Sequence, residues 1–362
     1  MRPAARLPLL AAGFLSLVFG VAAGLARLGW DVPLPREGFA FLHGALMAAA
    51  FFGTVIGLER AVALGSTWAY LGPLASGIGG LAMIAGAYDP AMVLIVAGSA
   101  VFLLASCVIL VRQPQLHNVC LVLGAASWHA GMLLLAIGEP QFAVTQWWIG
   151  FLVLTIAGER LELSRFMPPS LAAKRVFAAI MTCLTVAPMT GWPATGASLL
   201  ALAAWLAWKD VALRTIRGRG LTRYIAACLL AGYAWLAVAA VIMLAGGEMQ
   251  PGRLAWDAAL HAVFLGFVFS MVFGHAPIIV PALFRAALPY HPAFYGPLAL
   301  LHASLGLRVA ADLFALPDWR AIAGAGNAAA IAAFIVAMLA AAARGKRGQT
   351  KQNTSDWDIK GG

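Results

Sequence analysis

Long apolar segments separated by short polar breaks run along almost the whole chain. A helix needs about 20 predominantly apolar residues to cross a bilayer. Twelve segments of that kind are predicted, at residues 7–28, 38–64, 68–87, 90–111, 117–138, 143–163, 172–190, 194–213, 222–246, 255–283, 293–316 and 320–343. The breaks hold helix-ending pairs such as Asp89-Pro90 and Pro251-Gly252. The pattern predicts an all-α fold, a polytopic transmembrane helix bundle of about twelve spans.

The two ends of the chain set the limits of this bundle. Arg2 and Arg6 precede the apolar run 7–28, as in a secretory signal peptide, but the run exceeds the usual 7–15 apolar residues of such a signal. We therefore expect a retained first helix and a single transmembrane bundle over residues 1–343. Residues 344–362 are polar, which predicts a disordered cytoplasmic tail.

Composition supports a membrane protein and argues against a nucleic-acid partner. The chain is 62% hydrophobic and 10% charged, whereas soluble domains carry about 25% charged residues. The net charge is +10, but the basic residues lie in short loops and the tail rather than in one patch. The four cysteines show no CxxC spacing, so we interpret them as small core residues. The lipid bilayer is the expected partner.

The basic residues also predict the orientation in the membrane. With the N-terminus inside, 19 of the 24 Lys and Arg residues fall on the cytoplasmic side. The remaining five lie outside or within the membrane and are Arg27, Arg36, Arg253, Arg308 and Arg320. Cytoplasmic loops of membrane proteins are enriched in Lys and Arg. Both termini are therefore expected in the cytoplasm.

Five histidines lie inside the apolar segments: His43, His129, His261, His275 and His302. Histidine is costly in hydrocarbon unless its ring nitrogens find partners, and imidazole is a ligand of haem iron and copper. By depth along the helices, His43, His129 and His261 fall in the outer half of the membrane, with His302 below them. We expect these three to approach one another and to bind a cofactor. Any one of them could instead bond a backbone carbonyl.

His275 lies 14 residues beyond His261, which is about 21 Å deeper along a helix. We therefore expect His275 to be too deep to join the outer centre. The alternative assignment is a separate inner site that uses His275, with His302.

Two Glu-Arg pairs stand at the predicted inner ends of helices, Glu59-Arg60 and Glu159-Arg160. We expect Glu59 and Glu159 to pair with arginines, either locally or across the two helices. The alternatives are snorkelling anchors at the interface and an ion-paired cluster near a proton entry.

A further charged pair lies in the predicted span 293–316. Arg308 and Asp312 have i,i+4 spacing, so they could neutralise each other, and Arg308 could instead meet a haem propionate.

The run Leu42-His43-Gly44-Ala45-Leu46-Met47 resembles the second helix of haem–copper oxidase catalytic subunits. The histidine of that helix ligates the low-spin haem from the outer side, as the predicted orientation of His43 would allow. The chain lacks the His-His and late His-x-His pairs of those enzymes, so we do not expect a respiratory oxidase.

The run from His261 to Met271, the triplet Phe273-Gly274-His275 and the triplet Leu307-Arg308-Val309 resemble NnrS-type nitric-oxide-response membrane proteins. These are twelve-span haem- and copper-containing proteins of denitrifying bacteria. The resemblance implies haem and/or copper as cofactor, with His43, His261 and His275 as metal ligands. It also implies nitric oxide or another small diatomic ligand, and a multi-pass location in the bacterial inner membrane. These proteins tend to carry a second histidine and an acid in a His-x-His-Glu arrangement, whereas Gly44 and Ala45 follow His43 here.

Three classes of function stay open. The first is a haem- or copper-binding protein in nitric-oxide response or redox metabolism. The second is a permease with histidines in a substrate or proton path, a class that tends to show broken helices and duplicated halves. The third is a structural or assembly subunit. No catalytic acid–base pair is visible, so enzymatic activity is left open.

Overall fold

The computed structural model describes residues 3–164, 169–246, 249–284 and 287–360, with side chains up to Gly345. Every regular element in these ranges is a helix. The α-helices are α1 (Leu7–Arg27), α2 (Phe52–Leu64), α3 (Leu71–Ala85), α4 (Tyr88–Arg112), α5 (Leu116–Ala136), α6 (Gln141–Leu163), α7 (Leu171–Thr190), α8 (Trp192–Lys209), α9 (Ala212–Thr215), α10 (Gly220–Ala245), α11 (Leu254–His261), α12 (Ser270–Phe284), α13 (Tyr295–Leu313) and α14 (Pro317–Lys360).

Two helical segments depart from α geometry. The π-helical segments η3 (Ala45–Phe51) and η6 (Ala262–Phe269) run directly into α2 and α12. Short 3₁₀ turns are η1 (Pro3–Arg6), η2 (Phe39–Leu42), η4 (Thr67–Tyr70) and η7 (Pro292–Phe294). π-helices are rare and occur frequently at functional sites.

All twelve predicted segments are covered by helix. Two of them are composite, because residues 38–64 hold η2, η3 and α2, and residues 255–283 hold α11, η6 and α12. Within the described residues, 10 helices are long and apolar enough to cross a membrane. The chain is a multi-pass membrane protein built as a helix bundle. α8 and α13 lie outside this group of ten and pack against α10 and α14 respectively.

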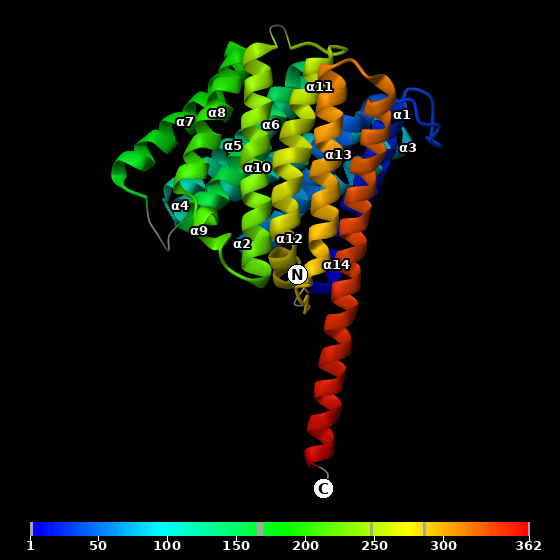
Figure 1. Cartoon of the computed structure of the whole chain (residues 1–362), viewed down its shortest axis with the longest axis vertical. Helices are drawn as coiled ribbons and strands as arrows, with labels where there is room; N and C mark the ends of the chain where they lie inside the picture. The colour runs from blue at the N-terminus through cyan, green and yellow to red at the C-terminus, as the bar shows by residue number, and fades with distance from the viewer. Residues whose placement is uncertain (1–2, 165–168, 247–248, 285–286, 361–362) are drawn as a thin grey trace.

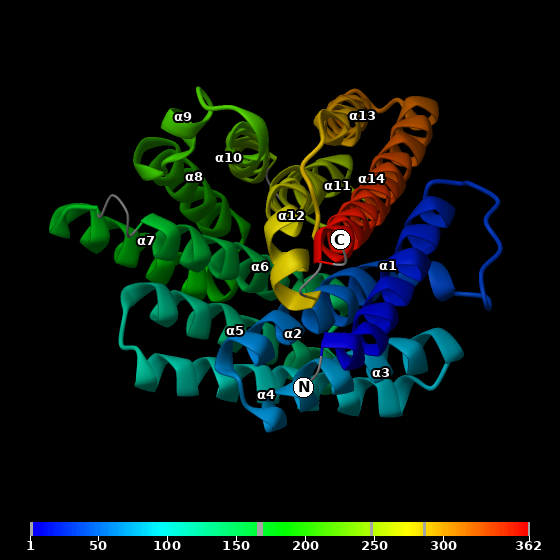
Figure 2. The ribbon, with the colours of Figure 1, turned by 90° about the horizontal axis from the view of Figure 1, so that it is seen from below.

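The bundle encloses a central group of helices. Seen from below, α2, α6 and α12 lie near the middle, with α3 and α4 on one side and α10 and α13 on the other (Figure 2). All residues of α6 from Trp148 to Gly158 are buried, as expected for a helix that is apolar on all faces. The start of α1 and the end of α14 lie on the same side of the bundle (Figure 1).

The last helix differs from the sequence prediction. Residues 344–362 were expected to be a disordered tail, whereas α14 continues as helix to Lys360 and projects beyond the bundle (Figure 1). The Arg, Lys and Gln residues of this stretch have high helix propensity, and no proline interrupts the helix after Pro317.

Candidate functional site

His43 lies at the end of η2, where its ring rests on α1. Its Nδ1 is 2.7 Å from the carbonyl oxygen of Gly20. A Cβ at Gly24 would lie 2.9 Å from the His43 ring, so only glycine leaves room for the ring there. The Gly20-x-x-x-Gly24 spacing is a known signal for close helix contact in membranes. This face of α1 fixes the position of His43.

His261 ends α11 and is held by the preceding turn of its own helix. Its Nδ1 lies 2.8 Å from the carbonyl oxygen of Asp257 and 3.4 Å from Oδ2 of the same residue. The i,i+4 spacing of Asp257 and His261 in the sequence is a signal for the side-chain contact between them.

The rings of His43 and His261 lie side by side. Their centroids are 6.2 Å apart and their planes are inclined by 18°. A carbonyl oxygen only accepts hydrogen bonds, so Nδ1 of each ring carries the proton and Nε2 carries the lone pair. Among the described residues, the hydrogen bonds of both rings use Nδ1 alone. Metal-ligating histidines donate their second ring N–H in this way.

A cavity of about 370 Å³ adjoins both rings. Its apolar wall includes Met47, Phe52 and Phe264, whereas Arg27 and Arg320 belong to its charged end. This end lies where α1 finishes and α14 begins. The volume falls in the range of about 300–1,000 Å³ that is typical of small-molecule and cofactor pockets.

An ion-pair network closes the charged end of the cavity. Asp257 Oδ2 accepts from Arg308 Nη2 at 2.9 Å and pairs with Arg320 Nη2 at 3.2 Å. Arg320 Nε also lies 2.6 Å from Asp312 Oδ1. The prediction that Arg308 pairs with Asp312 is therefore wrong. The i,i+4 spacing within α13 would allow Arg308 to pair with Asp312. In the structure, Asp257 of α11 pairs with Arg308 and Arg320 of α14 pairs with Asp312.

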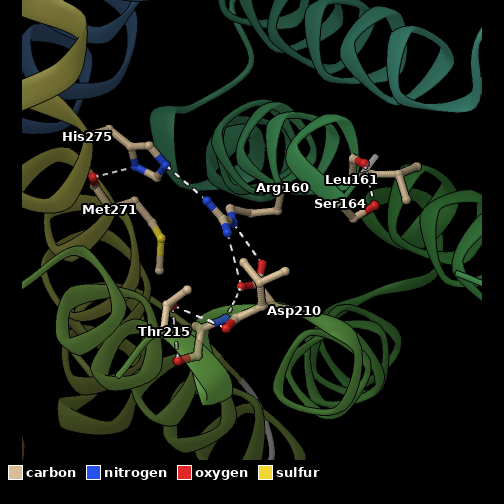
Figure 3. Close-up of polar contacts among 9 residues, drawn as sticks. Arg160, Leu161, Ser164, Asp210, Thr215, Met271 and His275 are labelled. Atoms are coloured by element: carbon tan, nitrogen blue, oxygen red, sulfur yellow. Dashed lines mark hydrogen bonds and ion pairs between the residues drawn. The ribbon is translucent and has the colours of Figure 1, made fainter. Parts of the chain in front are cut away.

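A second polar cluster surrounds Arg160, at the end of the bundle that the sequence predicts to face the cytoplasm, called the inner end below. Arg160 Nε and Nη2 donate to the two Asp210 carboxylate oxygens at 2.8 and 3.0 Å, and Nη1 lies 3.4 Å from His275 Nε2. Figure 3 shows Arg160 between Asp210 and His275. His275 Nδ1 lies 2.7 Å from the Met271 carbonyl oxygen, so both of its ring nitrogens have partners.

This cluster corrects the predicted Glu-Arg pairing. The partner of Arg160 is Asp210, in the break after α8, and not a glutamate. Within the described ranges, no ion pair is found for Glu59 or Glu159. Asp210 was missed because its partner lies 50 residues away in the sequence.

The other two predicted histidines lie elsewhere. His129 Nδ1 is 2.9 Å from Ser99 Oγ, so its ring faces α4. His302 Nδ1 accepts from Trp235 Nε1 at 3.0 Å, and its Nε2 lies 3.4 Å from Ser270 Oγ. No group of three or more His, Cys, Asp or Glu residues in the described part of the chain could hold a metal ion. The expected meeting of His43, His129 and His261 is thus wrong, because similar depth does not place helices side by side.

The chain is a multi-pass helical membrane protein with a cavity beside two histidines. Over residues 6–343 the chain matches the family described as a domain of unknown function, DUF8744, and it belongs to that family. No curated protein and no solved structure matches the chain. The resemblance to NnrS-type proteins stays a prediction.

Proposed function

We propose that this protein binds one haem in the membrane through His43 and His261 and acts in redox or nitric-oxide metabolism. The observation that carries the proposal is the pair of rings whose Nδ1 atoms are anchored on carbonyl oxygens beside an apolar cavity. The ring centroids are only 6.2 Å apart, so both side chains would reach one group bound in the cavity.

The donor set favours haem over copper. A porphyrin supplies four nitrogens itself, so two histidines from the protein complete the coordination of the iron. A copper ion would take its ligands from the chain, and no group of three or more His, Cys, Asp or Glu residues in the described part of the chain could hold a metal ion. The apolar wall of the cavity also suits a porphyrin face. A bound haem would supply one-electron redox chemistry, and a small diatomic ligand such as nitric oxide would bind the iron only in place of one of the two histidines.

The test is the absorbance spectrum of protein purified after expression with ample haem. We expect a Soret band in the wild type and its loss in His43→Ala and in His261→Ala. His129→Ala is the matched control, because it removes an intramembrane histidine that faces α4. Size-exclusion elution of each variant reports whether it remains folded. If the wild type binds no haem, the proposal fails.

We also propose that the protein crosses the bacterial inner membrane twelve times with both termini in the cytoplasm. The 19 of 24 basic residues on one side support this orientation. The start of α1 and the end of α14 on one side of the bundle fit an even number of spans (Figure 1). Reporter fusions at Lys351 and Gly252 test the topology. A periplasmic reporter at Lys351 would overturn it.

A permease is the second candidate, and one observation favours it. The non-α segments η3 and η6 interrupt two central helices beside the cavity, and transporters often bind substrate at broken helices. Ligand-dependent uptake into vesicles by protein that lacks haem would support the permease over the haem protein.

A further inference from the structure

We infer that the cavity selects a ligand carrying two acidic groups, and that Arg27 is one of the cations that hold them. The inference rests on the proposed haem function and specifies the porphyrin class, a dicarboxylate. It follows from the charges at one end of the cavity rather than from the histidines.

Three guanidinium groups from three helices line this end of the cavity. Arg27 ends α1, Arg308 lies on α13, and Arg320 lies near the start of α14. Arg308 is buried, whereas Arg27 is exposed. An arginine fork matches a carboxylate in geometry as well as in charge, so arginine is well suited to binding one.

The protein neutralises only part of this positive charge. Asp257 pairs with Arg308 and Arg320, and the fully buried Asp312 pairs with Arg320. Arg27 has no ion pair with any described residue. Three cations thus face two carboxylates, which leaves one positive charge at the cavity.

One hydrogen-bond donor of Arg308 is not used by Asp257. Its bonds to Asp257 use Nε and Nη2, which leaves Nη1 outside that pair. A charged group away from water is costly unless an opposite charge is near. An anion at this end of the cavity would accept from Nη1 of the buried Arg308 and would also neutralise the exposed Arg27.

The charge of a dicarboxylate haem matches this excess. A ferric porphyrin core carries one positive charge and the two propionates carry two negative charges, so the ligand is a net monoanion. Placed with its carboxylates at Arg27, Arg308 and Arg320, it neutralises the cavity. A porphyrin diester lacks the carboxylates and leaves the excess charge unpaired.

The experiment compares ferric protoporphyrin IX with its dimethyl ester, each titrated into purified protein in detergent. We expect the dicarboxylate to bind at least about tenfold more tightly, since each factor of ten corresponds to about 1.4 kcal/mol. Arg27→Gln should reduce this preference severalfold, and its exposed position makes the substitution compatible with folding.

Arg253→Gln is the matched control. It removes one exposed positive charge just before α11, at a residue that does not line the cavity, so the preference should not change. If acid and ester bind equally well, or if Arg27→Gln and Arg253→Gln behave alike, the inference is overturned while the haem site stands. If neither porphyrin binds to the wild type, the proposed function fails as well.

Discussion

His261 and His275 stand on one continuous helical segment and share the same local contact. Each donates Nδ1–H to the carbonyl oxygen four residues before it, of Asp257 and of Met271. They differ at Nε2, which faces Arg160 in His275 and has no hydrogen-bond partner among the described residues in His261. Identical backbone anchoring therefore produces a satisfied core histidine in one place and a candidate ligand in the other.

The difference comes from the neighbouring helices rather than from the histidines. At the inner site, α6 and the residue after α8 supply an arginine and an aspartate that close the cluster (Figure 3). At the outer site, α1 supplies the glycine face and the neighbouring helices leave a cavity. An open Nε2 beside a cavity is thus a better sign of a ligand than burial alone.

The largest expected effect comes from opening the inner cluster. Asp210→Ala leaves the Arg160 guanidinium unpaired in a site where its side chain is 5% exposed. Removing one partner of a buried pair costs about 3–5 kcal/mol. We expect a loss of that size in the free energy of unfolding, measured by SDS titration in mixed micelles, with Glu139→Ala in an exposed loop as control. A loss below about 1 kcal/mol would mean that water screens the pair.

Next in size is a change that crowds the outer site. Gly24→Ala places a Cβ 2.9 Å from the His43 ring, so the ring or the helix must move. Overpacking of this kind costs about 1–3 kcal/mol. We expect a lower melting temperature together with weaker haem binding. Gly296→Ala is the control, because nothing lies within 4 Å of the Cβ it would add. Equal haem binding by the two variants would argue against His43 as a ligand.

A smaller effect is expected at His275. His275→Ala removes the acceptor of a long bond from Arg160 Nη1, so the stability loss should be about 1 kcal/mol. The Soret band should remain, in contrast to its loss in His261→Ala. A spectrum of His275→Ala that lacks the band would mean that His261 and His275 both support haem binding. The contrast drawn here between the two histidines would then be wrong.

The smallest expected effect is a coupling close to zero between Glu59 and Arg160. Because Arg160 pairs with Asp210, the stability losses of Glu59→Gln and Arg160→Gln should add to within about 0.5 kcal/mol in the double variant. A larger coupling energy would mean that Glu59 and Arg160 interact directly across the two helices.

Hydropathy located the helices well, because the length of an apolar run determines whether it can span a bilayer. It also placed His43 and His261 at similar depth, where the structure brings their rings together. Depth failed for His129, since α5 packs between α4 and α6 and turns that ring toward Ser99. Rotation about a helix axis and cross-helix partners such as Asp210 depend on tertiary packing. No local pattern encodes them.

The π-helical segments have a consequence for comparing members of this family. Each begins within two residues of a histidine of the pair and ends at a phenylalanine, and Phe51 and Phe269 stack with centroids 6.3 Å apart. Losing one residue inside either segment would restore the α register and turn the preceding part of the helix by about 100°. The histidine would then point away from the cavity. A one-residue alignment gap at 45–51 or 262–269 would therefore mark relatives that retain the helix bundle but lack the two-histidine cavity.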